Sequence, residues 1–247
     1  MDLRTGAAFW PLKNGFLNSY PALAGDERAD VLVIGAGITG ALMAERLSAA
    51  GADVVVVDRR DVGFGSTAAT TGLLQYETDT SLMEIAGKRG LDAVRTYRLG
   101  LRAIDDIEQL TEEVGNPCGF SRRRSVYLAS TLGDAGTLEA ECALRRAHGF
   151  DVEWLGPDAL RARYGLAVPA GAIASVGNAQ IDAYRFTHAL FAAASRRGAR
   201  VYDRTEVNTI PIAPRAWWRR PIVARVSRRG GSCGRPATRR WRKPSDA

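Results

Sequence analysis

Residues 31–72 read VLVIGAGITGALMAERLSAAGADVVVVDRRDVGFGSTAATTG, and this stretch decides the fold. It opens with the continuous apolar run Val31–Ile34, which is typical of a parallel strand covered on both faces. A glycine-rich turn follows, then small residues that predict a helix over residues 39–50, then four valines that predict a strand over residues 53–57. This order of strand, turn, helix and strand is the unit that binds the pyrophosphate of a dinucleotide.

The turn Gly35-Ala36-Gly37-Ile38-Thr39-Gly40 places three glycines where a side chain would interfere. Gly35 allows the tight change of direction, Gly37 lets the backbone approach the pyrophosphate, and Gly40 lets the helix pack closely on the strand. The helix N-terminus then offers unpaired N–H groups and a partial positive charge to the phosphates. A lone GxGxxG is a weak signal, and an ordinary strand–helix turn without a ligand is the alternative. The complete unit favours a bound dinucleotide.

The second strand ends in an acid, Asp58, which lies 18 positions beyond Gly40. A carboxylate at this place accepts hydrogen bonds from the ribose hydroxyls of an adenosine. Its charge would repel a 2′-phosphate and therefore disfavours NADP, although Arg59 and Arg60 weaken that objection.

A second cluster of glycines and hydroxyls follows the acid, Gly63-Phe64-Gly65-Ser66-Thr67 and then Gly72-Leu73-Leu74-Gln75. A nicotinamide enzyme usually continues from its second strand into another helix. Small residues with N–H and hydroxyl donors instead suit a longer ligand that runs past the pyrophosphate to a ribityl chain and a flavin. The segment favours FAD, and an NAD-dependent Rossmann enzyme is the alternative.

With these motifs, the chain resembles the FAD-dependent oxidoreductases of the D-amino-acid oxidase, glycine oxidase and sarcosine oxidase superfamily. The resemblance lies in the leader before residue 30, in ADVLVIGAGITG and DRRDVGFGSTAATTGLL (residues 29–40 and 58–74), and in AQIDAYRFTHALFAAASRRGARVYDRTEV (residues 179–207). It covers about the first 207 residues and is loose between the two ends. It implies an α/β fold, in which a Rossmann-like FAD-binding domain carries an inserted, incomplete antiparallel α+β substrate region.

The resemblance also implies which residues contact the cofactor. Backbone groups of Ile38 and Thr39 would touch the pyrophosphate, Asp58 and Arg59 the adenosine, and the backbone of Val207 the adenine. Family members often have proline where Ala183 stands, which is a minor departure. With the glycines of both clusters and the positions along the ribityl chain and flavin, the predicted FAD site comprises Gly35, Gly37, Ile38, Thr39, Gly40, Asp58, Arg59, Gly65, Ser66, Thr67, Thr71, Gly72, Leu73 and Val207.

The same resemblance implies a domain division and a reaction. Residues 1–88 and 179–210 would form the FAD-binding domain, and residues 89–178 part of the substrate or cap region. The reaction would be oxidation of a small amine or amino acid by hydride transfer from the substrate Cα–H to flavin N5, giving an imine that hydrolyses. The family's substrate-binding residues lie largely in a later part of the chain that is not recognisable in this sequence. No catalytic residue and no oligomeric state is therefore predicted.

Between the two matching ends, hydrophobic periodicity predicts further elements. The charge run Arg122-Arg123-Arg124 is interpreted as a solvated loop rather than an anion site. The predicted helices cover residues 89–114, 138–147, 158–163 and 184–197, and the predicted strands residues 125–129 and 199–202.

Composition disfavours several other classes of function. The N-terminus MDLRTGAAFWPLKNG lacks the apolar core of a secretory signal, and no run of 18 apolar residues predicts a membrane span. The scattered Cys118, Cys142 and Cys233 lack metal-ligand spacing and indicate a reducing cytoplasm. The only histidines, His148 and His188, are too few for a histidine-rich metal site and are interpreted as helix-surface or packing residues.

The pattern breaks near Asn208. Residues 211–247 carry ten arginines and one lysine against one aspartate, so the formal charge of +7 belongs to this segment and residues 1–210 sum to −3. A basic, disordered arm that binds nucleic acid is one hypothesis. The favoured hypothesis is a frameshift near residue 208, because Arg, Trp, Pro, Gly, Ala and Ser are the residues that GC-rich DNA encodes out of frame. Nucleic acid is therefore not the expected partner.

Translation of the coding DNA beyond codon 208 in the other two frames tests the frameshift hypothesis. One frame is expected to continue with a strand-rich flavoenzyme sequence, because the segment before codon 208 still resembles the family. The hypothesis is abandoned if neither frame does so.

Overall fold

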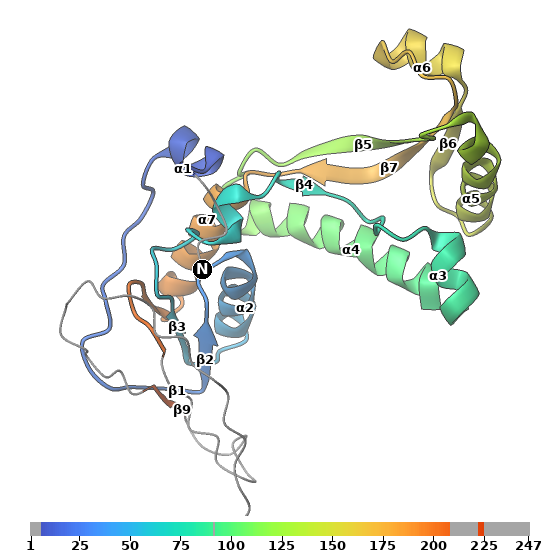
Figure 1. Ribbon diagram of the computed structural model, residues 1–247. Helices are drawn as coiled ribbons and strands as arrows, with labels where there is room; N and C mark the ends of the chain where they lie inside the picture. The colour runs from blue at the N-terminus through green and yellow to red at the C-terminus, as the bar shows by residue number, and fades with distance from the viewer. Residues whose placement is uncertain (1–5, 91, 208–221, 225–247) are drawn as a thin grey trace, which may run out of the picture.

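The glycine-rich stretch forms a parallel strand–helix–strand unit, as the sequence predicts. In the computed structural model, which describes residues 6–90, 92–207 and 222–224, β2 (Val31–Ile34) leads into α2 (Ile38–Ala49) and β3 (Val54–Val57). A distant strand, β8 (Arg200–Tyr202), pairs in parallel with β3 and gives the sheet order β2–β3–β8 (Figure 1). The chain therefore returns to the sheet of β2 and β3 after a long intervening segment.

The alternating valines of β3 pack into two separate hydrophobic cores, one on each face of the strand. Val54 and Val56 face the core that α2 shares with α7 (Ala183–Arg196), and all four valines of the strand are fully buried. Val55 and Val57 face the opposite side and pack with Leu23 of the leader. A strand with both faces covered reads as a continuous apolar run, which explains the VVVV sequence.

The segment between β3 and β8 forms a second, antiparallel sheet around β7 (Ala172–Gln180). The strand β5 (Ser121–Leu128) pairs along one side of β7, while β4 (Leu73–Leu74) and β6 (Val152–Leu155) pair with opposite ends of its other side. The long helix α4 (Asp92–Glu113) runs alongside this sheet (Figure 1).

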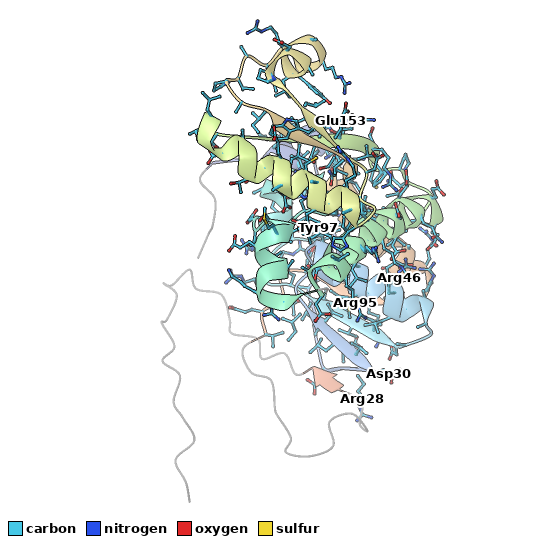
Figure 2. The ribbon with its side chains drawn as sticks, turned by 90° about the vertical axis from the view of Figure 1, so that its right-hand side faces the viewer. Arg28, Asp30, Arg46, Arg95, Tyr97 and Glu153 are labelled. Carbon is cyan, nitrogen blue, oxygen red and sulfur yellow. The ribbon has the colours of Figure 1, made fainter. Side chains whose placement is uncertain are left out.

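Aromatic side chains fill the core between this sheet and its helices. The rings of Tyr76 and Phe150 stack with their centroids 5.8 Å apart, and Tyr97 of α4 meets both rings edge-on. Figure 2 shows Tyr97 in the interior among the helices. The remaining elements are α1 (Phe9–Asn14), β1 (Glu27–Ala29), α3 (Leu82–Arg89), α5 (Ala135–Ala147), α6 (Pro157–Tyr164), β9 (Ile222–Ala224) and the 3₁₀ turns η1 (Ser66–Ala69) and η2 (Leu132–Asp134).

The α/β class and the antiparallel insertion are confirmed, and the FAD-type strand–helix–strand unit is off by one residue at its ends. The single helix predicted over residues 89–114 is wrong at its start, because Gly90 has a positive φ of 58° and separates α3 from α4. The strands β6 and β7 were not predicted. Beyond Asn208, where the sequence pattern breaks, residues Ile222–Ala224 nevertheless form a short strand that pairs antiparallel with β1. The expected disorder of the rest of the tail lies outside the described residues.

The arginine run at 122–124 lies in β5, so its interpretation as a loop is wrong. Arg122 forms ion pairs with Asp105 and Glu108 of α4, and Arg123 donates a hydrogen bond to Gln180. Local charge density suggested a solvated turn, but partners distant in the sequence hold these arginines on a strand beside α4.

The start of α7 is fixed by Asp182, whose side chain is buried. Its carboxylate caps the helix by accepting the Arg185 N–H at 3.0 Å, and it accepts Asn14 Nδ2 of α1 at 2.9 Å. The Asp182 N–H donates to the Cys118 carbonyl at 2.8 Å. One side chain therefore joins α1 and α7, while its backbone joins the segment before β5.

Replacing Asp182→Ala is expected to lower the free energy of unfolding by about 1–2 kcal/mol, because the α7 cap and the tie to α1 are lost together. Asp182→Asn is the matched control, since asparagine caps helices as well as aspartate does. Urea unfolding monitored by circular dichroism measures both. Equal losses in the two variants would contradict the capping role.

Candidate functional site

The carboxyl ends of β2 and β3 open onto a hollow of about 340 Å³, which we call the first hollow. Ligands of open parallel sheets bind outside the carboxyl ends of the strands, and this hollow has that position. It brings together Gly35, Asp58, Arg59 and Val207, four residues of the predicted site that come from three distant parts of the sequence. The other lining residues are Ile34, Val57, Arg60, Thr205 and Glu206.

Asp58 has a second role that the sequence did not predict. Its Oδ2 accepts the N–H of Ala36 at 2.7 Å, and its Oδ1 accepts the N–H of Arg60 at 2.8 Å. Each carboxylate oxygen can accept about two hydrogen bonds, so each keeps capacity for a further donor in the hollow. Asp58 therefore holds the shape of the glycine turn while still lining the first hollow.

The N-terminus of α2 follows the first hollow directly. Its N-cap is Gly37, which provides no capping side chain. The Ile38 N–H, predicted to face a pyrophosphate, donates instead to Thr67 Oγ1 at 3.0 Å. Thr39 is exposed, and N–H groups in the first helical turn have no intrahelical partner. This N-terminus can therefore still offer N–H donors and a partial positive charge to an anion.

Two glycines of the turn, Gly37 and Gly40, lie in close contact with their surroundings. A Cβ at Gly40 would collide with the carbonyl oxygen of Gly35, and a Cβ at Gly37 would lie 3.1 Å from Thr67 Oγ1. The predicted reason for Gly40, close packing of the helix on the strand, agrees with the geometry, because a Cβ there would also lie 3.3 Å from a side-chain carbon of Val33 in β2.

A second hollow of about 270 Å³ lies between α2, η1, β4 and α7. Of the predicted site it gathers Ile38, Ser66, Thr67, Gly72 and Leu73, and its lining is mainly apolar. Gly65 and Thr71 neighbour these residues in sequence but do not line the hollow. Residues that sequence reasoning missed complete the wall: Leu42, Thr70, Leu74, Ile107, Ile181, Ala183 and Phe186. Of these, Ile107 belongs to the apolar side of a predicted helix, which gave no sign of a ligand.

The turn at residues 70–72 is held from two directions. The Ile181 N–H donates to the Gly72 carbonyl at 2.8 Å, and the Trp10 indole Nε1 donates to the Thr70 carbonyl at 2.7 Å. Gly72 has a φ of 72°, and a Cβ there would collide with the Ile181 carbonyl. The wall of the second hollow is therefore set by α1 and by the start of α7.

Neither histidine lines either hollow. His188 is buried on α7, with its ring centroid 4.6 Å from that of Tyr184. Burial lowers the pKa of His188 to about 4, so the ring is neutral at physiological pH. Within residues 6–90, 92–207 and 222–224, no group of three or more His, Cys, Asp or Glu side chains could hold a metal, and no helix is long and apolar enough to span a membrane.

Known proteins are similar to this chain in sequence and in fold. Glycine oxidase from Geobacillus kaustophilus is 29% identical over 189 residues, which cover 73% of this chain and 47% of that protein. Gamma-glutamylputrescine oxidoreductase from Escherichia coli is 26% identical over 185 residues, covering 73% and 43%. The crystal structure of the Geobacillus glycine oxidase superimposes with a TM-score of 0.65 at 25% identity, covering 74% and 48% of the two chains. The chain thus spans less than half the length of these relatives.

The family profile described as FAD dependent oxidoreductase (DAO) matches residues 30–231, which is most of the chain. The match includes β2, the glycine turn, both hollows and β8. The chain belongs to the FAD-dependent oxidoreductase family.

Proposed function

We propose that this chain binds FAD across the two hollows and serves in the oxidation of a small amine or amino acid. One observation carries the proposal: nine of the fourteen predicted cofactor residues line two hollows, and the α2 N-terminus borders both, with Gly35 in the first and Ile38 in the second. A dinucleotide needs an adenosine pocket, a pyrophosphate site and a pocket for its second ring system in this order.

The side chains present fit these three parts of the cofactor. In the first hollow, the free lone pairs of Asp58 would accept the ribose hydroxyls, while Arg59 and the Val207 backbone would border the adenosine. The N-terminus of α2, with Gly37 and Thr39, would face the pyrophosphate. In the second hollow, the hydroxyls of Ser66 and Thr67 suit the ribityl chain.

The apolar wall of the second hollow suits a flavin ring. Leu73 and Gly72 line it, and Gly65 and Thr71 would meet the cofactor from the adjoining turn. When bound, FAD supplies the two-electron acceptor that oxidation of a C–N bond requires. The protein contributes orientation, through the Asp58 contacts, and exclusion of water from the apolar hollow.

The substrate class comes from the relatives, whose names include glycine oxidase and gamma-glutamylputrescine oxidoreductase. We further propose the domain division given by the sequence, with residues 1–88 and 179–210 as the FAD-binding domain and 89–178 as part of the substrate region. The shared sheet of β2, β3 and β8 supports it. A cytoplasmic location is consistent with the free thiols of Cys118 and Cys142, both buried.

Fluorescence titration of the purified chain with FAD tests cofactor binding. The wild type is expected to bind, and Asp58→Asn to bind about tenfold more weakly, because a charge-assisted hydrogen bond to the ribose is lost. Asp61→Asn is the matched control, since Asp61 pairs with Arg204 at 3.2 Å and lines neither hollow. The proposal would be contradicted if FAD did not bind, or if the chain bound FAD no more tightly than it binds NAD.

Anaerobic mixing of the FAD-loaded chain with glycine or gamma-glutamylputrescine tests the reaction. The absorbance of oxidised flavin is expected to fall with at least one of them, because electrons from the C–N bond pass to the flavin. Free FAD with the same amines is the control. Oxidised flavin that persists with every amine rules out the activity for this chain.

A further inference from the structure

The leader helix α1 reaches the second hollow only from behind its wall. Thr70, Gly72 and Leu73 line that hollow, and no residue of α1 does. The indole Nε1 of Trp10 in α1 donates to the Thr70 carbonyl at 2.7 Å, although the two residues are 60 positions apart in the sequence. Among the described residues, this carbonyl accepts no other hydrogen bond. A single side chain of the leader therefore holds the Thr70 carbonyl in place.

The turn at residues 70–72 has room for the indole because Gly72 has no side chain. A Cβ at Gly72 would lie 2.9 Å from Cζ2 of Trp10, closer than packed carbon atoms approach one another. Within α1, the ring of Phe9 meets the indole edge-on at 5.0 Å between centroids, and the Lys13 ammonium lies 5.0 Å from the centroid of the indole. These contacts restrict the indole to the orientation in which its N–H meets the turn.

The other end of α1 is tied to the start of α7. Asn14 Nδ2 donates to Asp182 Oδ2 at 2.9 Å, and the Lys13 ammonium lies 3.7 Å from the same oxygen. The Asp182 side chain is buried, so these contacts are little screened by water. The helix α1 therefore bridges the turn at residues 70–72 and the start of α7, the two segments that meet at the second hollow.

The adenosine end of the proposed site does not depend on α1 in this way. The first hollow is held by the Asp58 carboxylate, which accepts the N–H groups of Ala36 and Arg60, and by the pairing of β2 with β3. Among the described residues, α1 forms no hydrogen bond with any residue that lines the first hollow. A change in α1 should therefore affect the two ends of the cofactor site differently.

We infer that Trp10 is a positioning residue for the flavin end of the cofactor, and that it acts through its hydrogen bond to the Thr70 carbonyl. The inference rests on the proposed binding of FAD and deepens it, because it gives the leader helix a part in the cofactor site. A turn that is not held in place would have to be ordered when the flavin binds, which lowers the affinity. Because coupling between sites is reciprocal, a flavin in the second hollow would also stabilise α1.

Calorimetric titration of the full chain with FAD and with ADP tests the inference, since ADP carries the adenosine and the pyrophosphate but no flavin. Trp10→Phe keeps an aromatic ring and removes the donor. It is expected to weaken FAD binding about threefold to tenfold and to change ADP binding by less than about twofold, because only FAD reaches the turn. Trp154→Phe is the matched control, since Trp154 lies in β6 and lines neither hollow.

Hydrogen exchange of the wild type measures the reciprocal effect and needs no variant. The Leu12 N–H donates to the Ala8 carbonyl and the Gly15 N–H to the Pro11 carbonyl, so their exchange reports on α1. Saturating FAD is expected to slow the exchange of both amides, and saturating ADP to leave it unchanged. This measurement decides the question if Trp10→Phe does not fold.

The inference is overturned if FAD binds more tightly than ADP but Trp10→Phe weakens both ligands equally or weakens neither. Exchange in α1 that FAD does not slow, or that ADP slows equally, would also overturn it. A different result separates the proposed function from the inference: FAD that binds no more tightly than ADP would show that the second hollow holds no flavin. That result would overturn the proposed function, and the role of Trp10 with it.

Discussion

The carboxylate of Asp58 is the contact on which the first hollow depends. It holds the glycine turn through Ala36 and the end of β3 through Arg60, and the Asp58 carbonyl accepts the Thr205 N–H at 2.7 Å. One residue therefore fixes three segments that come from distant parts of the chain. Two of these hydrogen bonds go to a carboxylate, an acceptor that binds N–H donors more strongly than a neutral carbonyl does, and they hold the turn against the end of β3.

The second hollow depends on the place where the chain passes between its two sheets. The chain leaves the parallel unit at Gly72 and returns at Ile181, and a hydrogen bond joins these two residues. Asp182 then caps α7 and ties α1 to the same place. The proposed flavin pocket thus lies where the two connections between the sheets meet. Hydrogen bonds hold these two connections together, which suits a site that must orient a cofactor.

Sequence reasoning succeeded where a local constraint selects the residue. Gly40 is required by contact with Gly35, and the valines of β3 by burial on both faces. Sequence reasoning failed where an element is defined by a pairing partner that lies far away in the sequence. The strand β7 reads AIASVGNAQ, with small and polar residues in place of an apolar run, and only its neighbours β5 and β6 define it.

The central claim is that the two hollows and the α2 N-terminus form one cofactor site. The crystal structure of the chain grown with FAD tests it most directly. The account predicts the adenine ring beside Asp58 and Val207, the pyrophosphate at the N-terminus of α2, and the flavin against Gly72 and Leu73. Electron density for FAD elsewhere, or for the adenosine half alone with the second hollow empty of flavin, would contradict it.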